Sequence, residues 1–241
     1  MSDPAKKTRW AADRLAEAMG VPERKGRKRD PLGQLVRTIL SQNTTDRNSE
    51  RAFVNFKDRF QDENGGWDWA AVAQMDRDGL EDLVRSAGLA GQKAKWIQAL
   101  LAWTQDRYGA WVLDDICEEA PETALDRLTE IPGVGVKTAA ILLCFTCEAD
   151  IFPVDTHVHR ICNRLGLAKA SSAEKTFRLM RDRVPEGRAY ELHRNMVRFG
   201  RERCRARNPK CADCPLQSRC RYRREEIAPE NSTDTSNRSS K

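Results

Sequence analysis

The sequence predicts an all-α protein of roughly ten helices. Apolar residues recur at three- and four-residue spacing along most of the chain, which is the period of a helix with one buried face. Alternating apolar and polar runs, which are typical of half-buried strands, are almost missing. The 241 residues, of which 39% are hydrophobic and 32% charged, suffice for one large globular domain or two modest ones.

The expected helices can be placed in order along the chain. The first covers residues 8–20 and stops at a glycine, and the second covers 30–42 and begins with an Asp cap followed by proline, a combination favoured at helix starts. Further amphipathic segments lie at 78–89, 92–109, 121–131, 136–147, 155–167, 172–184 and 187–204. We expect residues 22–30 to be a charged, flexible connection and residues 225–241 to be a disordered polar tail.

Charge is distributed unevenly along the chain, whose net charge is +6. Residues 198–224 contain ten basic and two acidic side chains, and residues 22–30 contain five basic and two acidic ones. Residues 60–130, by contrast, contain fifteen acidic and six basic side chains. Basic ends around an acidic middle suit a polyanionic partner such as nucleic acid. Solubility alone is the alternative explanation.

The sequence also bears on where the protein works. It has no run of 18 apolar residues that could span a membrane, and its first ten residues lack the apolar stretch of a secretory signal. Eight cysteines without an export signal indicate a reducing compartment. We therefore expect a cytoplasmic protein whose cysteines bind metal or lie buried rather than form disulfides.

A glycine turn in LTEIPGVGVKTAAILLCF, residues 128–145, separates two helical segments. A helix, a Gly-x-Gly turn and a second helix would present the backbone N–H groups of Gly133, Gly135 and Val136 at a positive helix end, where they can bind an anionic oxygen. A tight turn that only packs two helices is the alternative. The basic composition of the chain favours a hairpin that binds the DNA backbone without reading its sequence.

Lys137 lies in the first turn of that second helix, where the helix dipole disfavours a cation by about 0.3–1 kcal/mol. The dipole therefore favours the free amine, which is a nucleophile towards carbon. Eighteen residues further on, Asp155 follows an apolar link and precedes an amphipathic helix. It is expected to cap that helix, and a fixed carboxylate could also take a proton or stabilise a developing sugar cation. We expect His157 and His159 to be structural.

Four cysteines near the C-terminus have the spacing C-x6-C-x2-C-x5-C; they are Cys204, Cys211, Cys214 and Cys220. Thiolates so close in sequence can surround one metal centre. Structural zinc usually shows two short Cys-x2-Cys pairs, and this segment has one. The unequal loops fit a cubane iron–sulfur cluster at least as well, so both metals stay open at this point.

The loop between the first two of these cysteines carries three cations, Arg205, Arg207 and Lys210. A loop stapled by metal would hold them rigidly against phosphates, which favours a structural role for the metal over a redox role. The remaining cysteines, Cys117, Cys144, Cys147 and Cys162, are expected to be small buried hydrophobic residues.

Together, LTEIPGVGVKTAAILL, VDTHVHRICNRLGL and the cysteine spacing resemble the endonuclease III family, which are bifunctional DNA glycosylases of the helix-hairpin-helix superfamily. The resemblance covers about residues 30–222. It implies a two-lobed all-α fold, with a six-helix barrel at 31–148 that ends in the hairpin. The second lobe would combine residues 1–30 with 149–224 and carry a [4Fe–4S] cluster on the four cysteines. DNA would lie across the cleft between the lobes.

The same resemblance implies an activity. A monomer that associates with the nucleoid would bind double-stranded DNA with damaged bases or abasic sites and remove oxidised pyrimidines. Lys137 matches the family's Schiff-base nucleophile and Asp155 its catalytic aspartate, and β-elimination would cut the strand 3′ to the abasic site. ILSQNTTD matches the loop that fills the vacated base stack, through either Gln42 or Asn43. Leu89 matches the leucine wedge that supports the kinked duplex.

Three alternatives remain beside this interpretation. A related glycosylase could act on pyrimidine dimers or on T:G and U:G mismatches, because pocket residues outside the motifs decide the substrate. A DNA-binding protein without catalysis could use the hairpin and cluster only to grip, and a cluster protein could sense redox state. An adenine glycosylase of the same superfamily is disfavoured. It needs a carboxylic acid in the early helix and lacks the lysine, whereas residues 31–45 here contain no Asp or Glu and Lys137 is present.

Overall fold

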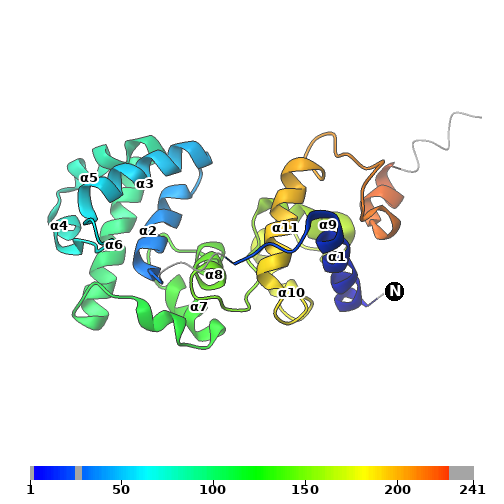
Figure 1. The fold of residues 1–241 in the computed structure, drawn as a ribbon, viewed down its shortest axis with the longest axis horizontal. Coiled ribbons are helices and arrows are strands. Elements are labelled where there is room, and N and C mark those ends of the chain that lie inside the picture. The colour runs from blue at the N-terminus through cyan, green and yellow to red at the C-terminus, as the bar shows by residue number, and fades with distance from the viewer. Residues whose placement is uncertain (1–2, 25–28, 228–241) are drawn as a thin grey trace, which may run out of the picture. The chain divides into compact units, whose positions relative to one another are not determined.

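The computed structural model describes residues 3–24 and 29–227 and is shown in Figure 1. Over these residues the chain is helical and forms no named strand; an isolated bridge joins Gln61 to Trp67. The all-α prediction is therefore confirmed. Within the described part of the chain, no helix is both long and apolar enough to cross a membrane.

The chain divides into two compact units. One comprises Gly26–Ala149, and the other combines Met1–Lys25 with Asp150–Lys241. Each unit has its own buried apolar core, so each can position side chains independently of the other.

The unit Gly26–Ala149 begins with α2 and ends with α8. Its helices are α2 (Pro31–Ser41), α3 (Asp46–Phe60), α4 (Trp69–Gln74), α5 (Arg77–Val84), η1 (Arg85–Ala87), α6 (Ala90–Tyr108), η2 (Asp114–Cys117), α7 (Pro121–Thr129) and α8 (Val136–Phe145). The apolar helix α2 packs against α3, α6 and α8. As predicted, the carboxylate of Asp30 caps α2 by accepting from the N–H of Gly33, directly before Pro31.

Two α-helices of this unit were not predicted. Helix α3 is rich in charged residues, but it buries Ala52, Phe56 and Phe60 at four-residue spacing. Helix α4 is only six residues long. Phe56 packs beside Trp67 and Trp69, so aromatic side chains fill this end of the unit.

The second unit is built around α11. It comprises α1 (Pro4–Met19), α9 (Thr156–Leu165), α10 (Ala173–Met180), α11 (Ala189–Glu202), η3 (Gln217–Arg219) and the turn η4 (Arg223–Ile227). Helix α11 contacts both α9 and α1, and α1 ends before Gly20 as predicted.

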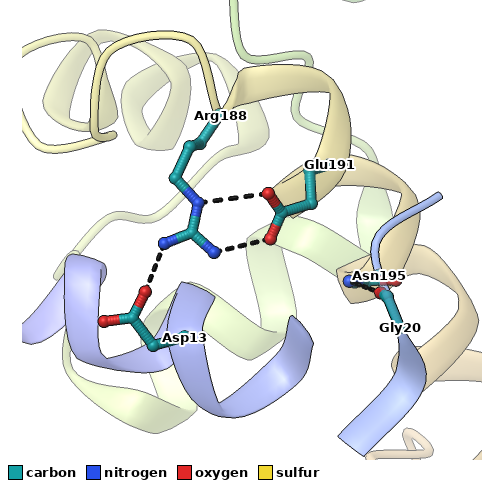
Figure 2. A network of polar contacts seen from close by, with 5 residues as sticks. All are labelled: Asp13, Gly20, Arg188, Glu191 and Asn195. Atoms are coloured by element: carbon teal, nitrogen blue, oxygen red, sulfur yellow. Dashed lines mark hydrogen bonds and ion pairs between the residues drawn. The ribbon is translucent and has the colours of Figure 1, made fainter. Parts of the chain in front are cut away.

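Polar contacts fix α1 to α11 (Figure 2). The guanidinium of Arg188, just before α11, binds both carboxylate oxygens of Glu191 and also reaches Asp13 of α1. Hydrogen bonding to Glu191 raises the pKa of Arg188, and the hydrogen bond to Asp13 contributes a smaller part in the same direction. The buried amide of Asn195 donates to the carbonyl of Gly20 at 3.0 Å. The N-terminal helix is thus anchored at both its middle and its end.

Two predictions need correction. The disordered tail was expected from residue 225, but residues 225–227 lie in η4, where Glu225 pairs with Arg221 at 3.7 Å; residues 228–241 lie outside the described part. Cys117 and Cys147 form a disulfide, against the prediction of reduced, buried thiols. The two cysteines meet because the fold places η2 beside the end of α8, which the sequence pattern does not reveal.

The flexible connection was predicted at residues 22–30. Of these, residues 25–28 lie outside the described part of the chain.

Candidate active site

The helical hairpin consists of α7, a short turn and α8. Gly133 in the turn has φ +86°, and a Cβ built on it would lie 2.3 Å from Cγ of Trp96. Glycine is therefore required at this position both by the left-handed backbone and by the indole of α6. Val134 next to it is buried, which seats the turn on the unit's core.

Gly135 differs from Gly133. Its φ is −91°, which any residue can adopt, and a Cβ there would meet nothing within 4 Å. No contact within the described part of the chain explains why this residue is a glycine. Helix α8 has no side-chain cap, and the amides of Gly133, Gly135 and Val136 donate to no acceptor in the part of the chain described. These groups are arranged as an anion-binding nest requires.

Lys137 is the second residue of α8 and is exposed. Its ammonium group makes no hydrogen bond or ion pair with any residue in 3–24 or 29–227. The side chain is therefore available to a ligand bound at the adjacent turn.

The loop after α2 holds the two candidate inserting residues, and they lie differently. The side-chain amide of Gln42 is half-buried and donates to the carbonyl of Gly133 at 3.0 Å and to Oγ1 of Thr138 at 3.1 Å. Asn43 is exposed and has a left-handed backbone with φ 50°. Gln42 thus fixes the loop to the hairpin, and Asn43 faces solvent.

Leu89 precedes α6 and also adopts a left-handed conformation, with φ 49° and ψ 38°. Its side chain is 58% exposed. A positive φ at a non-glycine residue is uncommon and strains the backbone. Because the side chain of Leu89 is largely exposed, burial in the core does not account for this strain.

Lys93 is a residue of this region that the sequence analysis missed. Its side chain is fully buried, and its ammonium donates to the carbonyls of Leu40 and Ala87, both at 2.8 Å. The signal was present in the sequence, because Lys93 shares the apolar stripe of α6 with Ile97 and Leu100 at helical spacing.

Asp155 belongs to the other unit, where it caps α9. Its Oδ1 accepts from the N–H of Val158 at 2.7 Å, as the sequence predicted. The preceding residues 151–154 are buried, and Nδ1 of His193 donates to the carbonyl of Pro153 at 2.8 Å. The backbone amide of Val158 therefore fixes the carboxylate, and His193 fixes the chain that leads to it.

The two histidines after Asp155 have structural partners. Nδ1 of His159 lies 2.7 Å from Oγ1 of Thr176. His157 lies against Gly200 of α11, and its Nδ1 is 3.0 Å from Nη2 of Arg160. These contacts join α9 to α10 and α11, which agrees with structural roles for both histidines.

The four C-terminal cysteines, Cys204, Cys211, Cys214 and Cys220, are unoxidised and line one pocket. Apolar side chains, including Phe199 and Leu216, form most of its wall. Four cysteine sulfurs in an apolar setting are the donor set that an iron–sulfur cluster takes, so the residues present fit such a cluster.

The chemistry of the thiols agrees with this fit. Burial raises the pKa of the Cys214 thiol to about 11 and also raises that of Cys211. A metal centre bound to these sulfurs would favour their thiolate forms. Arg164 of α9 holds the segment by donating to the carbonyls of Arg205 at 2.6 Å and Ala206 at 2.9 Å.

The cysteine segment carries three cations at the protein surface. Arg205, Arg207 and Lys210 are all exposed, and their side chains form no ion pair within the residues described. They remain available to a polyanion.

Comparison with known proteins agrees with the site. Residues 36–186 match the model of the HhH-GPD superfamily base excision DNA repair proteins, and residues 204–220 match the iron–sulfur binding domain of endonuclease III. Endonuclease III of Thermotoga maritima is 33% identical over 83% of this chain and 87% of its own. That of Bacillus subtilis is 36% identical over 80% and 81%.

A solved structure of a non-covalent endonuclease III–DNA complex matches with a TM-score of 0.76 and 26% identity, covering 95% of this chain and all of the other. Sequence, fold and cysteine segment therefore agree. The chain belongs to the endonuclease III family of the HhH-GPD superfamily, and it is a base-excision DNA glycosylase that carries a [4Fe–4S] cluster.

Proposed function

We propose that this glycosylase binds double-stranded DNA with an oxidised pyrimidine or an abasic site, and that Lys137 is its nucleophile. The observation that carries the proposal is the exposed ammonium of Lys137 beside the amides of Gly135 and Val136, none of which has a partner within residues 3–24 and 29–227. A turn that binds the DNA backbone would bring that amine near the deoxyribose of the same strand. Proximity of this kind supplies much of the rate of a covalent step.

The reaction follows from the chemistry of an amine and a sugar. The free amine of Lys137 attacks C1′ of the deoxyribose while the C1′–N bond to the damaged base breaks, and the base leaves with a proton. The sugar ring opens to a Schiff base between Nζ and C1′. The imine acidifies the C2′ proton; once that proton is lost, the C3′–O bond breaks and the strand is cut 3′ to the abasic site.

Asp155 assists this chemistry in our proposal. Its carboxylate takes the proton that the lysine must lose, or stabilises the positive charge that develops on the sugar. The capping bond to Val158 supports this role because it fixes the position of the carboxylate.

The remaining contacts concern recognition. We assign insertion into the base stack to Asn43 and the wedge to Leu89, because both are exposed, and phosphate binding to Arg205, Arg207 and Lys210. Flipping the base costs a few kcal/mol, least at a lesion, which supports a preference for damaged bases. We propose that the enzyme acts as a monomer associated with the nucleoid.

Borohydride trapping tests the nucleophile. Reduction of the Schiff base during turnover on a thymine-glycol or abasic duplex should link enzyme and DNA covalently. Lys137→Gln should abolish both the link and strand cleavage. A Lys137→Gln protein that still cross-links to the same extent would refute the assignment.

Lys137→Arg is the matched control for a lysine that only contacts phosphate. Arginine keeps the cation but is not a nucleophile at neutral pH. The proposal predicts that Lys137→Arg binds the duplex and forms no cross-link, whereas a phosphate contact would tolerate the change.

A further inference from the structure

We infer that Lys93 is a positioning residue that sets the spacing of the two loops by which the enzyme enters DNA. The loops are residues 41–45, with Asn43, and residues 87–90, with Leu89. This inference rests on the proposed function, in which these two side chains insert into the duplex.

The geometry comes from one atom that serves two loops. Nζ of Lys93 donates to the carbonyl of Leu40, in the last turn of α2, and to the carbonyl of Ala87, the last residue of η1. Carbonyls at helix ends lack partners within their own helix. The ammonium of this one α6 residue therefore links the end of α2 to the end of η1.

Both linked carbonyls lie just before the residues that face solvent. Asn43 follows Leu40 by three residues, and Leu89 follows Ala87 by two. Both have a positive φ, and both are exposed. Fixing these carbonyls fixes the starting point of each left-handed turn, and so the separation of the two inserting side chains.

Burying the charged side chain of Lys93 is destabilising, so its presence calls for a physical explanation. The side chain is fully buried with no acidic partner among residues 3–24 and 29–227, and burial lowers the pKa of its amine. Leaving a charge in the interior is strongly destabilising unless the charged group is well hydrogen-bonded. A leucine or methionine would fill the same stripe of α6 without that cost, but it could not join two carbonyls.

A purely structural lysine and a positioning lysine predict different results. If Lys93 only stabilises the unit, a folded Lys93→Met protein should engage DNA like the wild type. If Lys93 positions the loops, the folded variant should bind the backbone but fail to open the base stack.

The experiment uses the full-length enzyme with its cluster and a duplex that carries 2-aminopurine opposite the lesion. Fluorescence of 2-aminopurine rises when its neighbours unstack, so it reports insertion directly. Lys93→Met should lose most of this signal and remove the base about ten- to a hundredfold more slowly. Borohydride trapping on a single-stranded abasic oligonucleotide, which needs no insertion, should stay at the wild-type level.

Lys95→Met is the matched control, since Lys95 is an exposed lysine two residues along the same helix. It should leave both readouts unchanged. Lys93→Arg serves as the second variant for the case in which loss of the cation unfolds the unit. Its planar guanidinium keeps the charge, but it is larger than an ammonium and its donors are fixed in one plane, so the variant should fold and show a reduced signal.

A folded Lys93→Met or Lys93→Arg protein with the wild-type fluorescence change would overturn the inference. Failure of the proposed function looks different. In that case the wild-type enzyme itself would show no trapping, or Asn43→Ala and Leu89→Ala would leave the fluorescence change intact.

Discussion

The side-chain amide of Gln42 donates to the carbonyl of Gly133, with Nε2 and O 3.0 Å apart. The loop after α2 and the hairpin turn before α8 are thereby joined, although they lie far apart in the sequence. The same amide reaches Thr138, so Gln42 has its partners inside the protein. The neighbouring Asn43 faces solvent.

Substitutions of Gln42 and Asn43 should therefore have different effects on stability and on insertion into DNA. Asn43→Ala should leave the free energy of unfolding unchanged and reduce the 2-aminopurine signal. Gln42→Ala should lower that free energy by about 1 kcal/mol, because it leaves the carbonyl of Gly133 unpaired. Urea denaturation and fluorescence check the pair. If Gln42→Ala lost insertion at full stability while Asn43→Ala kept it, the two roles would be reversed.

The two glycines of the hairpin should respond in opposite ways to alanine. Gly133→Ala should destabilise the fold by about 2–4 kcal/mol, because φ is +86° and the new Cβ would enter the ring of Trp96. Gly135→Ala should leave stability within about 0.5 kcal/mol but weaken duplex binding about tenfold by blocking the approach of a phosphate.

Urea denaturation and fluorescence anisotropy measure these two effects. Gly135→Ala with undiminished affinity would exclude the nest as the backbone site. In that outcome the glycine would have no structural or binding role that these contacts explain.

The disulfide between Cys117 and Cys147 closes a loop of 30 residues that contains the whole hairpin. Restricting a loop of that length in the unfolded chain is worth about 3–4 kcal/mol in the chain-entropy model. Reductant should lower the urea midpoint of the wild type by a corresponding amount. The double variant Cys117→Ser with Cys147→Ser should start at the lower midpoint and show no response, which controls for effects on the cluster. Alkylation of both thiols without prior reduction would rule out the cross-link.

Removal of the iron should free the segment from Cys204 to Cys220. With the cluster bound, trypsin should cut slowly after Arg205 and Arg207, because four ligands and Arg164 hold this backbone. After chelation, cleavage at both sites should accelerate, while cleavage within Gly26–Ala149 should not change. Mass spectrometry of the fragments makes the comparison. Equal cleavage with and without iron would show that the cluster does not order the loop.

Residue patterns were enough to predict much of this fold. The periodic helices, the Asp30 and Asp155 caps and the stop at Gly20 depend on local chemistry that can be recognised directly in the sequence. Helix α3 was missed because its charged residues outnumber the three that it buries. Helix α4 was missed because six residues show no clear period.

The candidate site was predictable where its chemistry is local. Lys137 and the four cysteines stand in motifs with short, fixed spacing. The choice between Gln42 and Asn43 depends on which way a left-handed backbone turns the side chains, and the disulfide depends on where η2 packs. Neither property leaves a pattern in neighbouring residues. Lys93 did leave one, as a lysine on an apolar stripe.

The most direct measurement identifies the residue that becomes bonded to the sugar. The borohydride-reduced complex is digested with protease and nuclease, and the peptide carrying the sugar remnant is sequenced by mass spectrometry. We predict a single adduct, on Nζ of Lys137. An adduct on another lysine, or on the N-terminal amine, would contradict the assignment of the nucleophile.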